Sequence, residues 1–246
     1  MNAVALPPQP LARIGLIGDV HAEPERLAAA LEHLASRSVD AVLCTGDVAD
    51  GHGCVNQCCE LLEAADVLCV AGNHERWILA DRVRHIPHAH AAGGLTERAR
   101  TFLDALPRTR RLPTVRGPLL LCHGVGERDH AKVWPGSPRM ATERSALLDA
   151  LIAQDQVRLV VNGHVHYRMI LDFDALTLIN AGTLRRDHRP GFLELDLDAG
   201  ELLFLGFDGS DRVFEQGRHA LDDHDRRVFR DTQDFDGDWK PFPRYG

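Results

Sequence analysis

The chain is short of basic residues and of long apolar runs. Its 246 residues include 28 Lys and Arg against 36 Asp and Glu, so the formal net charge is −8. Proteins that coat nucleic acid are usually basic, and we expect no stable nucleic-acid binding here. No apolar run approaches the ~18 residues of a membrane-spanning helix. The N-terminal residues also lack the basic and apolar regions of a signal peptide. We therefore expect a cytoplasmic protein that does not associate with membranes.

Short apolar runs alternate with helical patterns, which is typical of an α/β fold. Strands are predicted over 14–17, 41–44, 67–70, 119–122 and 158–161, and β-rich segments over 175–179, 192–197 and 202–207. Helices are predicted over 24–36, 54–65, 96–106 and 141–153. We divide the chain into an N-terminal extension (1–12), one domain (13–218) and a charged, aromatic C-terminal tail or arm (219–246).

Histidine is plentiful, with 14 in the chain, and several histidines belong to polar clusters that follow the predicted strands. In chain order these clusters contain Asp19 and His21, Asp47, Asn73 and His74, His123, and His164 and His166. Ligands of open α/β sheets bind beyond the carboxyl ends of the strands. The clusters are therefore expected to meet at one edge of the fold.

The chemistry of these side chains indicates a centre for two metal ions. Two carboxylates, one amide oxygen and four imidazoles form a mixed oxygen and nitrogen set that suits transition metals. Two ions about 3.5–4 Å apart can clamp a phosphoryl group and lower the pKa of a shared water. We expect two divalent ions, Mn first, with Fe, Zn, Ni or Mg as alternatives, and an anionic phosphoester as the guest.

The ordered motifs DxH, GD, GNHE, HG and GHxH between Asp19 and His166 resemble those of the calcineurin-like metallophosphoesterases. The segment 179–183 is similar to the NPGS turn of small bacterial phosphodiesterases, whereas GNHE is phosphatase-like. The resemblance implies a four-layer α-β-β-α sandwich, in which two mixed β-sheets are flanked by helices.

The resemblance also implies roles for individual residues. One metal would be surrounded by Asp19, His21, Asp47 and His166, and the other by Asp47, Asn73, His123 and His164. His74 would be the catalytic residue, facing the leaving group and donating a proton to it. Glu75 and Asp50 would hold these neighbours in place.

The sequence departs from the phosphoprotein phosphatases at their GDxVDRG motif, where the phosphate-binding Arg is replaced by Gly51. Four arginines beside the motifs are candidates for contacts with the substrate phosphate: Arg76, Arg128, Arg185 and Arg186. A histidine-rich loop with His85, His88 and His90 is interpreted as lying near the cleft, with a third metal site as the alternative. His52 and His130 also neighbour the motifs.

The sequence thus predicts a dinuclear phosphoester hydrolase in which metal-bound hydroxide attacks phosphorus in line. A phosphodiesterase or broad phosphatase acting on small molecules or nucleotides is favoured. The alternatives are a phosphoprotein (Ser/Thr) phosphatase and a non-catalytic scaffold on the same fold, which would be marked by loss of His74 or of a metal ligand. A homo-oligomer is compatible with the sequence.

Overall fold

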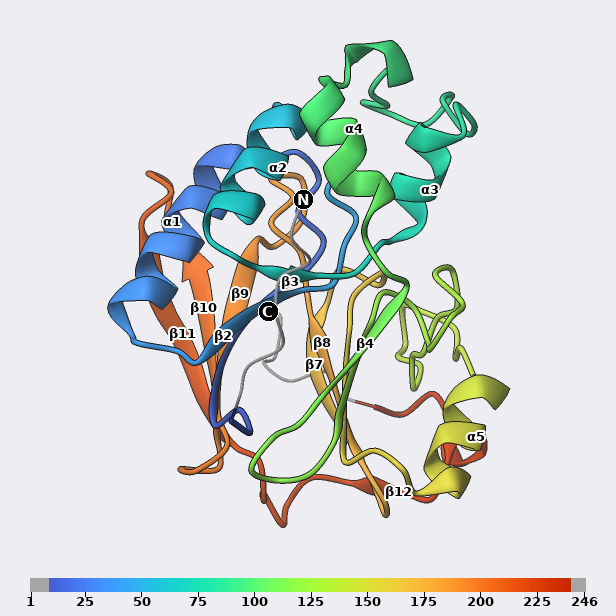
Figure 1. The fold of residues 1–246 in the computed structure, drawn as a ribbon. Helices are drawn as coiled ribbons and strands as arrows, with labels where there is room; N and C mark the ends of the chain where they lie inside the picture. Colours follow the sequence, from blue (N-terminus) through green and yellow to red (C-terminus); the bar gives the residue numbers. More distant parts are fainter. Residues whose placement is uncertain (1–8, 240–246) are drawn as a thin grey trace.

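Two mixed sheets of six strands each form the centre of the structure, a computed structural model that describes residues 9–239. The sheets face each other, and helices cover their outer faces (Figure 1). The predicted four-layer sandwich is therefore confirmed. No helix within residues 9–239 is long and apolar enough to cross a membrane.

The first sheet contains β1 (Arg13–Ile17), β2 (Ala41–Cys44), β3 (Leu68–Cys69), β9 (Gly191–Asp196), β10 (Glu201–Phe207) and β11 (Val213–Ala220). Its strand order is β11-β10-β9-β1-β2-β3, with β1, β2 and β3 parallel and β9 to β11 antiparallel. The helices α1 (Pro24–Ser36) and α2 (Val55–Ala64) connect the parallel strands. Leu27 and Leu34 of α1 are fully buried against this sheet, as the helical spacing predicts.

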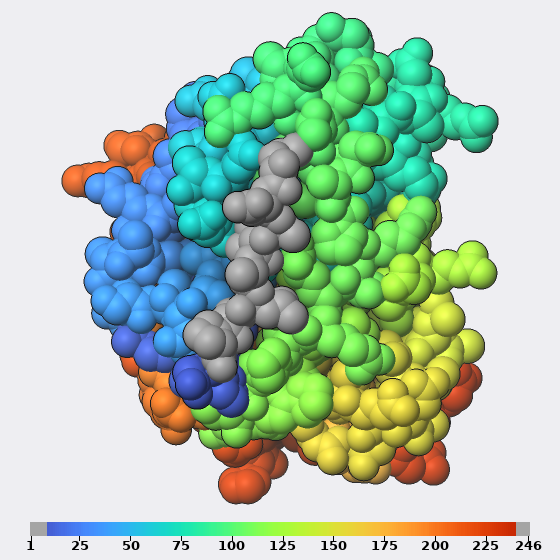
Figure 2. Space-filling model, viewed as in Figure 1, coloured from blue at the N-terminus to red at the C-terminus, as the bar shows by residue number. Residues whose placement is uncertain are grey.

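The second sheet contains β4 (Thr109–Leu112), β5 (Leu119–Cys122), β6 (Leu159–Asn162), β7 (Arg168–Phe173), β8 (Thr177–Ala181) and β12 (Val228–Phe229). Its order is β12-β7-β8-β6-β5-β4, and β5, β6 and β8 are parallel neighbours. Helix α5 (Ala146–Gln154) packs on the outer face of this sheet. In the space-filling view, α1 and α2 (blue to cyan) and α5 (yellow) cover opposite sides of the molecule (Figure 2).

Alternating side chains divide the core into layers. Leu16 faces the space between the sheets, whereas its neighbour Ile17 packs on the helix side. In β6, Leu159 and Val161 face the first sheet and Val160 faces α5. Because strand side chains alternate between faces, unbroken apolar runs such as these belong to strands covered on both sides.

Several elements differ from the predictions. Helix α5 begins at Ala146 rather than at 141, because Ser145 caps it by accepting from Leu148 N and Glu143 forms a bridge with Trp134. The strands β4, β7, β11 and β12 and the helix α3 (Asn73–Leu79) were not predicted. Helix α4 (Glu97–Asp104) is slightly shorter than predicted, and a 3-10 turn, η1 (Ala92–Gly94), precedes it.

The C-terminal segment contributes to the hydrophobic core between the second sheet and α5. Strand β12 pairs in parallel with β7, and the 3-10 turn η2 (Thr232–Asp234) follows it. Phe229 and Phe235 are each 1% exposed and lie against Phe173. The division into extension, domain and tail stays a prediction, and residues 1–8 and 240–246 lie outside the described residues.

Candidate metal centre

The seven predicted ligand residues meet at one rim of the sandwich. They follow β1, β2, β3, β5 and β6, which are parallel within their sheets and end on the same side. Two groups form, one with Asp19, His21, Asp47 and His166 and the other with Asp47, His123 and His164. Asp47 belongs to both groups, and the Asn73 Oδ1 atom lies 3.1 Å from His123 Nε2 in the second.

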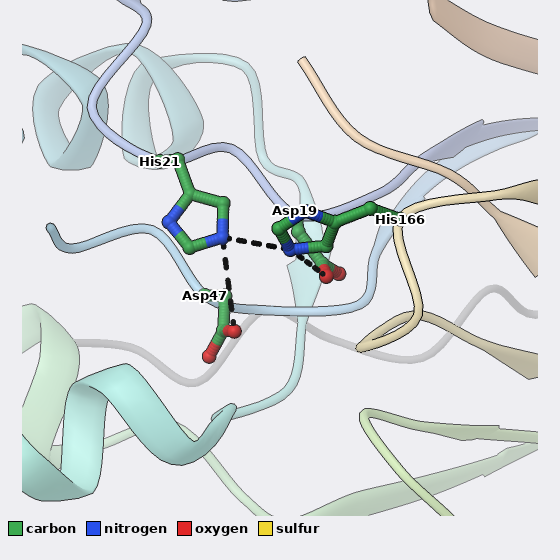
Figure 3. Close-up of side chains that lie close together, drawn as sticks. All are labelled: Asp19, His21, Asp47 and His166. Carbon is green, nitrogen blue, oxygen red and sulfur yellow. Dashed lines mark hydrogen bonds and ion pairs between the residues drawn. The ribbon is translucent and has the colours of Figure 1, made fainter. Parts of the chain in front are cut away.

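The first group brings hydrogen-bond acceptors together (Figure 3). His21 Nδ1 donates to the Asp50 carbonyl oxygen at 2.7 Å, so the Nε2 atom of the neutral ring carries a lone pair. Burial lowers the pKa of His21 to about 4, which keeps the ring neutral. Its Nε2 lies 3.0 Å from His166 Nε2 and 3.9 Å from Asp47 Oδ2, while His166 Nε2 lies 3.1 Å from Asp19 Oδ2. Imidazole lone pairs and carboxylate oxygens this close together repel one another unless a proton or a cation lies between them.

The second group repeats this arrangement around His123. His123 Nδ1 donates to the Thr45 carbonyl oxygen at 2.8 Å, and its Nε2 lies 3.2 Å from Asp47 Oδ2. Burial opposes the charged form of His123, but Asp47 and Asp19 outweigh it and raise its pKa to about 10. A proton on His123 therefore balances the carboxylates where a metal ion would otherwise do so.

His164 supplies an unused donor atom to the second group. Its Nε2 is buried and has no hydrogen-bond partner among residues 9–239. Burial, with the charge of His123, lowers the pKa of His164 to about 4, so the ring is neutral and its lone pair is available. Buried polar atoms rarely stay without partners, and a metal ion would satisfy this one. The residues present therefore fit two divalent ions bridged by Asp47.

The backbone at the site adopts conformations that are rare for residues with side chains. Positive φ angles occur at four of the predicted ligands, with His21 and Asp47 at 47°, His164 at 68° and His166 at 61°. Each such residue costs about 1–3 kcal/mol and persists only where its surroundings fix it. Clustering of this strain on the ligands is consistent with a functional site.

Glu75 fixes the loop that carries Asp47. Its Oε2 accepts from the backbone N–H groups of Asp47 and Gly72, both at 2.8 Å. Its Oε1 accepts from Val48 N at 2.7 Å and from Ala49 N at 3.0 Å. Burial and the nearby Asp47 raise the pKa of Glu75. One carboxylate thus ties the start of α3 to the Asp47 loop.

Asp50 orients His74 and is itself held by His90 of the histidine-rich loop and by Arg84, for which no role was predicted. His74 Nδ1 lies 2.7 Å from Asp50 Oδ2, and Arg84 donates to both oxygens, NH1 to Oδ1 at 2.8 Å and NH2 to Oδ2 at 2.9 Å. The His90 backbone N–H donates to Oδ1 at 2.9 Å. Burial opposes ionisation of Asp50, but its bonds with His74 and Arg84 lower its pKa to about 2. His74 Nε2 lies 3.8 Å from Asp47 Oδ2, so the ring faces the centre.

The histidine-rich loop docks on the site through His90, whose Nδ1 accepts from Asp50 N at 3.1 Å. His85 is exposed. His88 and His52 lie near Asp187 in a group that could hold an ion. However, the centroids of these two rings lie 3.7 Å apart with their planes tilted by 37°, closer than the 4.8 and 5.2 Å between ring pairs of the metal centre. This ring contact and the 2.9 Å bond between His52 and Asp187 account for the exposed group without a metal.

The four candidate arginines lie in different environments. Arg76 pairs with Asp129 at 2.7 Å, Arg185 with Asp187 at 3.4 Å, and Arg186 with the buried Glu23 at 2.8 Å. Arg128 lines a cleft with His130 and has no acidic partner among the described residues.

Gly51 lies where the phosphoprotein phosphatase motif has its phosphate-binding Arg. Here a Cβ at position 51 would lie 1.8 Å from the His21 carbonyl oxygen. Real side chains cannot approach backbone so closely, so this loop path excludes an Arg at position 51.

Comparisons with known proteins agree with this geometry. Residues 12–200 match the model of the calcineurin-like phosphoesterase superfamily domain, and the chain belongs to this family. It is a metallophosphoesterase domain with an intact candidate metal site. The predicted family is therefore confirmed.

Similar proteins are distant. The uncharacterised protein MJ0912 of Methanocaldococcus jannaschii is 33% identical over 66 residues, and the match spans 27% of each chain. A metallophosphoesterase from Sphaerobacter thermophilus superposes with a TM-score of 0.58 at 20% identity, covering 79% of this chain and 87% of that one. The hypothetical protein PH1004 from Pyrococcus horikoshii OT3 gives 0.65 at 12% identity, covering 80% and 89%. At these identities the two structures support the fold.

Proposed function

We propose that the protein hydrolyses phosphodiesters of small molecules or nucleotides, with a broad phosphatase activity as the nearest variant. The observation that carries this proposal is the complete set of seven ligand residues beside His74, whose ring Asp50 directs toward Asp47. When bound, two divalent ions, Mn²⁺ first and Fe, Zn, Ni or Mg as alternatives, would activate water for in-line attack and offset phosphoryl charge.

His74 is proposed to protonate the leaving oxygen. Its Nδ1–H is engaged by Asp50, which leaves Nε2 as the atom that faces the centre. Asp50 stabilises the protonated ring, and its contacts with Arg84 and His90 prevent it from turning away. A proton supplied in this way offsets the charge that develops on the leaving group as its bond to phosphorus breaks.

The two alternatives have less support. A phosphoprotein phosphatase would need a phosphate-binding side chain where Gly51 leaves no room for one. A non-catalytic scaffold has no need for a full set of ligand residues and an oriented His74. Within the proposal the substrate is a small anion, the site of action is the cytoplasm, and neither stable nucleic-acid binding nor membrane association is required.

The test compares hydrolysis of bis(p-nitrophenyl) phosphate and p-nitrophenyl phosphate by protein that has been stripped of metal and reloaded with Mn²⁺. Asp47→Asn is the control, because it removes a carboxylate charge from the group shared by both metal positions. Diester turnover that vanishes in Asp47→Asn supports the phosphodiesterase. A monoester preference points to the phosphatase. Inactivity on both substrates with two bound metals would favour the scaffold.

A further inference from the structure

Two clefts flank the metal centre, and their charges differ. The first is lined by Arg76, Arg108, Glu127, Arg128, Asp129 and His130 among others. The second, which we name the lysine cleft, has a volume of about 600 Å³ and is lined by Lys132, Arg139, His164, His166, Asp187 and Arg189, with Met140, Val165, Tyr167 and His188. Because His164 and His166 belong to the two ligand groups, the lysine cleft opens directly onto both metal positions.

The lysine cleft has cations that lack carboxylate partners. Neither Lys132 nor Arg139 forms an ion pair with any residue in the part of the chain that the structure describes. The carboxylate in the lining, Asp187, is already engaged by His52 at 2.9 Å and by Arg185 at 3.4 Å. The protein carries a net charge of −8, so two cations without acidic partners at the centre's edge are well placed to bind an anion.

The opposite cleft differs because two of its three arginines are paired. Asp129 binds Arg76 at 2.7 Å and lies 3.4 Å from Arg108. Glu127 adds a second carboxylate to that lining. An anionic group there would meet one arginine without an acidic partner among the described residues, Arg128, beside the carboxylates of Glu127 and Asp129. In the lysine cleft it would meet both Lys132 and Arg139.

The segment that carries Arg139 is ordered by its own hydrogen bonds. Trp134 and Glu143 exchange backbone hydrogen bonds at 2.9 and 2.8 Å, and Ser137 and Met140 do so at 2.9 and 3.2 Å. The base of this hairpin is fixed by Trp134, which is 2% exposed and packs against Tyr167 at 5.1 Å. Arg139 thus lies in the tight turn of a braced hairpin, which lowers the entropy lost when a ligand binds.

We propose that the lysine cleft binds a second anionic group of the substrate, so that the preferred substrates are phosphodiesters with a further phosphate or carboxylate on the non-leaving arm. The inference rests on the proposed function, because the scissile phosphate would lie at the metal centre. Met140 and Val165 provide apolar surface for the carbon linker between the two anions. The cleft gives that linker and its terminal group space next to His164 and His166.

The test uses three p-nitrophenyl phosphodiesters that share one leaving group and carry a propyl arm, which is unsubstituted or ends in a carboxylate or a phosphate. The measured quantity is the ratio of kcat/KM for each anionic substrate to kcat/KM for the neutral one, with Mn²⁺-loaded protein at two salt concentrations. The variants are Lys132→Met and Arg139→Met, which remove the charge and keep an unbranched, flexible side chain. Arg128→Met, in the opposite cleft, is the matched control.

We expect the wild-type ratio to exceed unity, and to fall about fivefold in Lys132→Met and in Arg139→Met, since charge-assisted hydrogen bonds are lost. High salt should reduce the ratio, because ions screen exposed charges. Arg128→Met should keep the wild-type ratio. Comparing the ratio for the carboxylate arm with the ratio for the phosphate arm shows which anion the cleft prefers. A wild-type ratio near unity, or a ratio lost in Arg128→Met instead, would overturn the proposal.

A binding measurement distinguishes two outcomes, namely that the lysine cleft does not bind a second anion and that the proposed hydrolytic activity is absent. Calorimetry with the corresponding products, propyl phosphate and 3-phosphopropyl phosphate, measures the second anion's contribution without turnover. One outcome is that no diester is hydrolysed, that 3-phosphopropyl phosphate binds more tightly than propyl phosphate, and that Lys132→Met and Arg139→Met remove this difference. That outcome would support anion binding in the lysine cleft and reject the proposed hydrolytic activity. Equal affinities for the two products would reject the cleft, whatever the activity.

Discussion

Asp50→Asn is the substitution that most directly examines how His74 works. The Asp50 carboxylate is 1% exposed and receives four donors, one from His74, two from Arg84 and one from His90, at 2.7 to 2.9 Å. An amide is almost the same size but carries no charge and has one oxygen. In either orientation its NH2 group faces two donors, which are His74 Nδ1–H and one Arg84 N–H group at the Oδ2 position, or the other Arg84 N–H group and the His90 N–H at the Oδ1 position. The fold is retained while the protonated ring of His74 loses its counter-charge.

The size of the effect follows from the hydrogen bond that is weakened. Hydrogen bonds to charged groups are worth about 1.5–3 kcal/mol. A factor of ten corresponds to 1.36 kcal/mol, so kcat should fall by about 10- to 100-fold where protonation of the leaving group limits the rate. This loss reaches only the lower end of the roughly 10²- to 10⁴-fold contribution of general acid catalysis, as expected when the acid is retained and only its counter-charge is removed.

The assay compares two leaving groups. Diphenyl phosphate releases phenol, whose pKa is close to the ~10 of tyrosine, whereas bis(p-nitrophenyl) phosphate releases a much weaker base that needs little help from a proton. Asp50→Asn should lose activity mainly on diphenyl phosphate and should keep its two metal ions in elemental analysis. The control is Asp129→Asn, which alters the Arg76 pair in the neighbouring cleft and should preserve the leaving-group dependence. Equal losses on both substrates, or loss of metal, would refute this role for Asp50.

Four further predictions concern the site and the fold. His74→Ala should keep both metal ions and lower kcat by on the order of 10² or more, as measured by metal analysis beside steady-state kinetics; loss of metal would show that His74 is a ligand. Chelation should inactivate the enzyme reversibly, and Mn²⁺ should restore activity better than Ca²⁺ because the site has four imidazoles; equal restoration would contradict the mixed donor set. Phe229→Ala should reduce the free energy of unfolding in urea by about 3–5 kcal/mol, because it empties a buried site in the core; an unchanged midpoint would mean that β12 contributes nothing to stability. Burial and Arg226 lower the pKa of His219 from 6.5 to about 4, so the folded protein favours the neutral ring. Stability should therefore be complete above pH 6.5 and decline as the pH falls toward 4. The decline in Tm should be shallower in His219→Gln, and parallel Tm curves for the two proteins would disprove the effect.

The ligand residues could be predicted because their positions depend on local sequence. Each follows a short apolar run, and a buried strand delivers whatever follows it to the carboxyl edge of its sheet. Asp19 and His21 follow β1 within four residues of Ile17, and Asp47 lies three residues after Cys44. Little freedom remains over such distances, so the order of the motifs was enough to indicate one shared rim.

Other parts of the site could not be predicted because they join residues that are distant in the chain. Arg84 reaches Asp50 across 34 positions, and His188 reaches His166 across 22. His188 Nδ1 lies 2.8 Å from His166 Nδ1 and helps to fix that ring. Each contact depends on the path of an irregular loop, which the local periodicity does not describe.

The fold divides in the same way. Short unbroken apolar runs bounded by polar residues indicated β1, β2, β5 and β6, because runs of this length suit strands that are buried on both faces, and helical spacing indicated α1. Strand β7 was missed because His166 and Tyr167 precede a run that begins with a buried Arg168, whose guanidinium donates to Gln216 at 2.6 Å. Partners far along the chain satisfy that charge, since the guanidinium also donates to the Leu205 carbonyl oxygen at 2.5 Å. The sequence alone therefore determined the family, the ligand order and the layered fold. Only the tertiary structure decided which arginines are paired, that Lys132 and Arg139 share one cleft beside the ligands, and what holds His74 in place, because these depend on contacts between loops far apart in the chain.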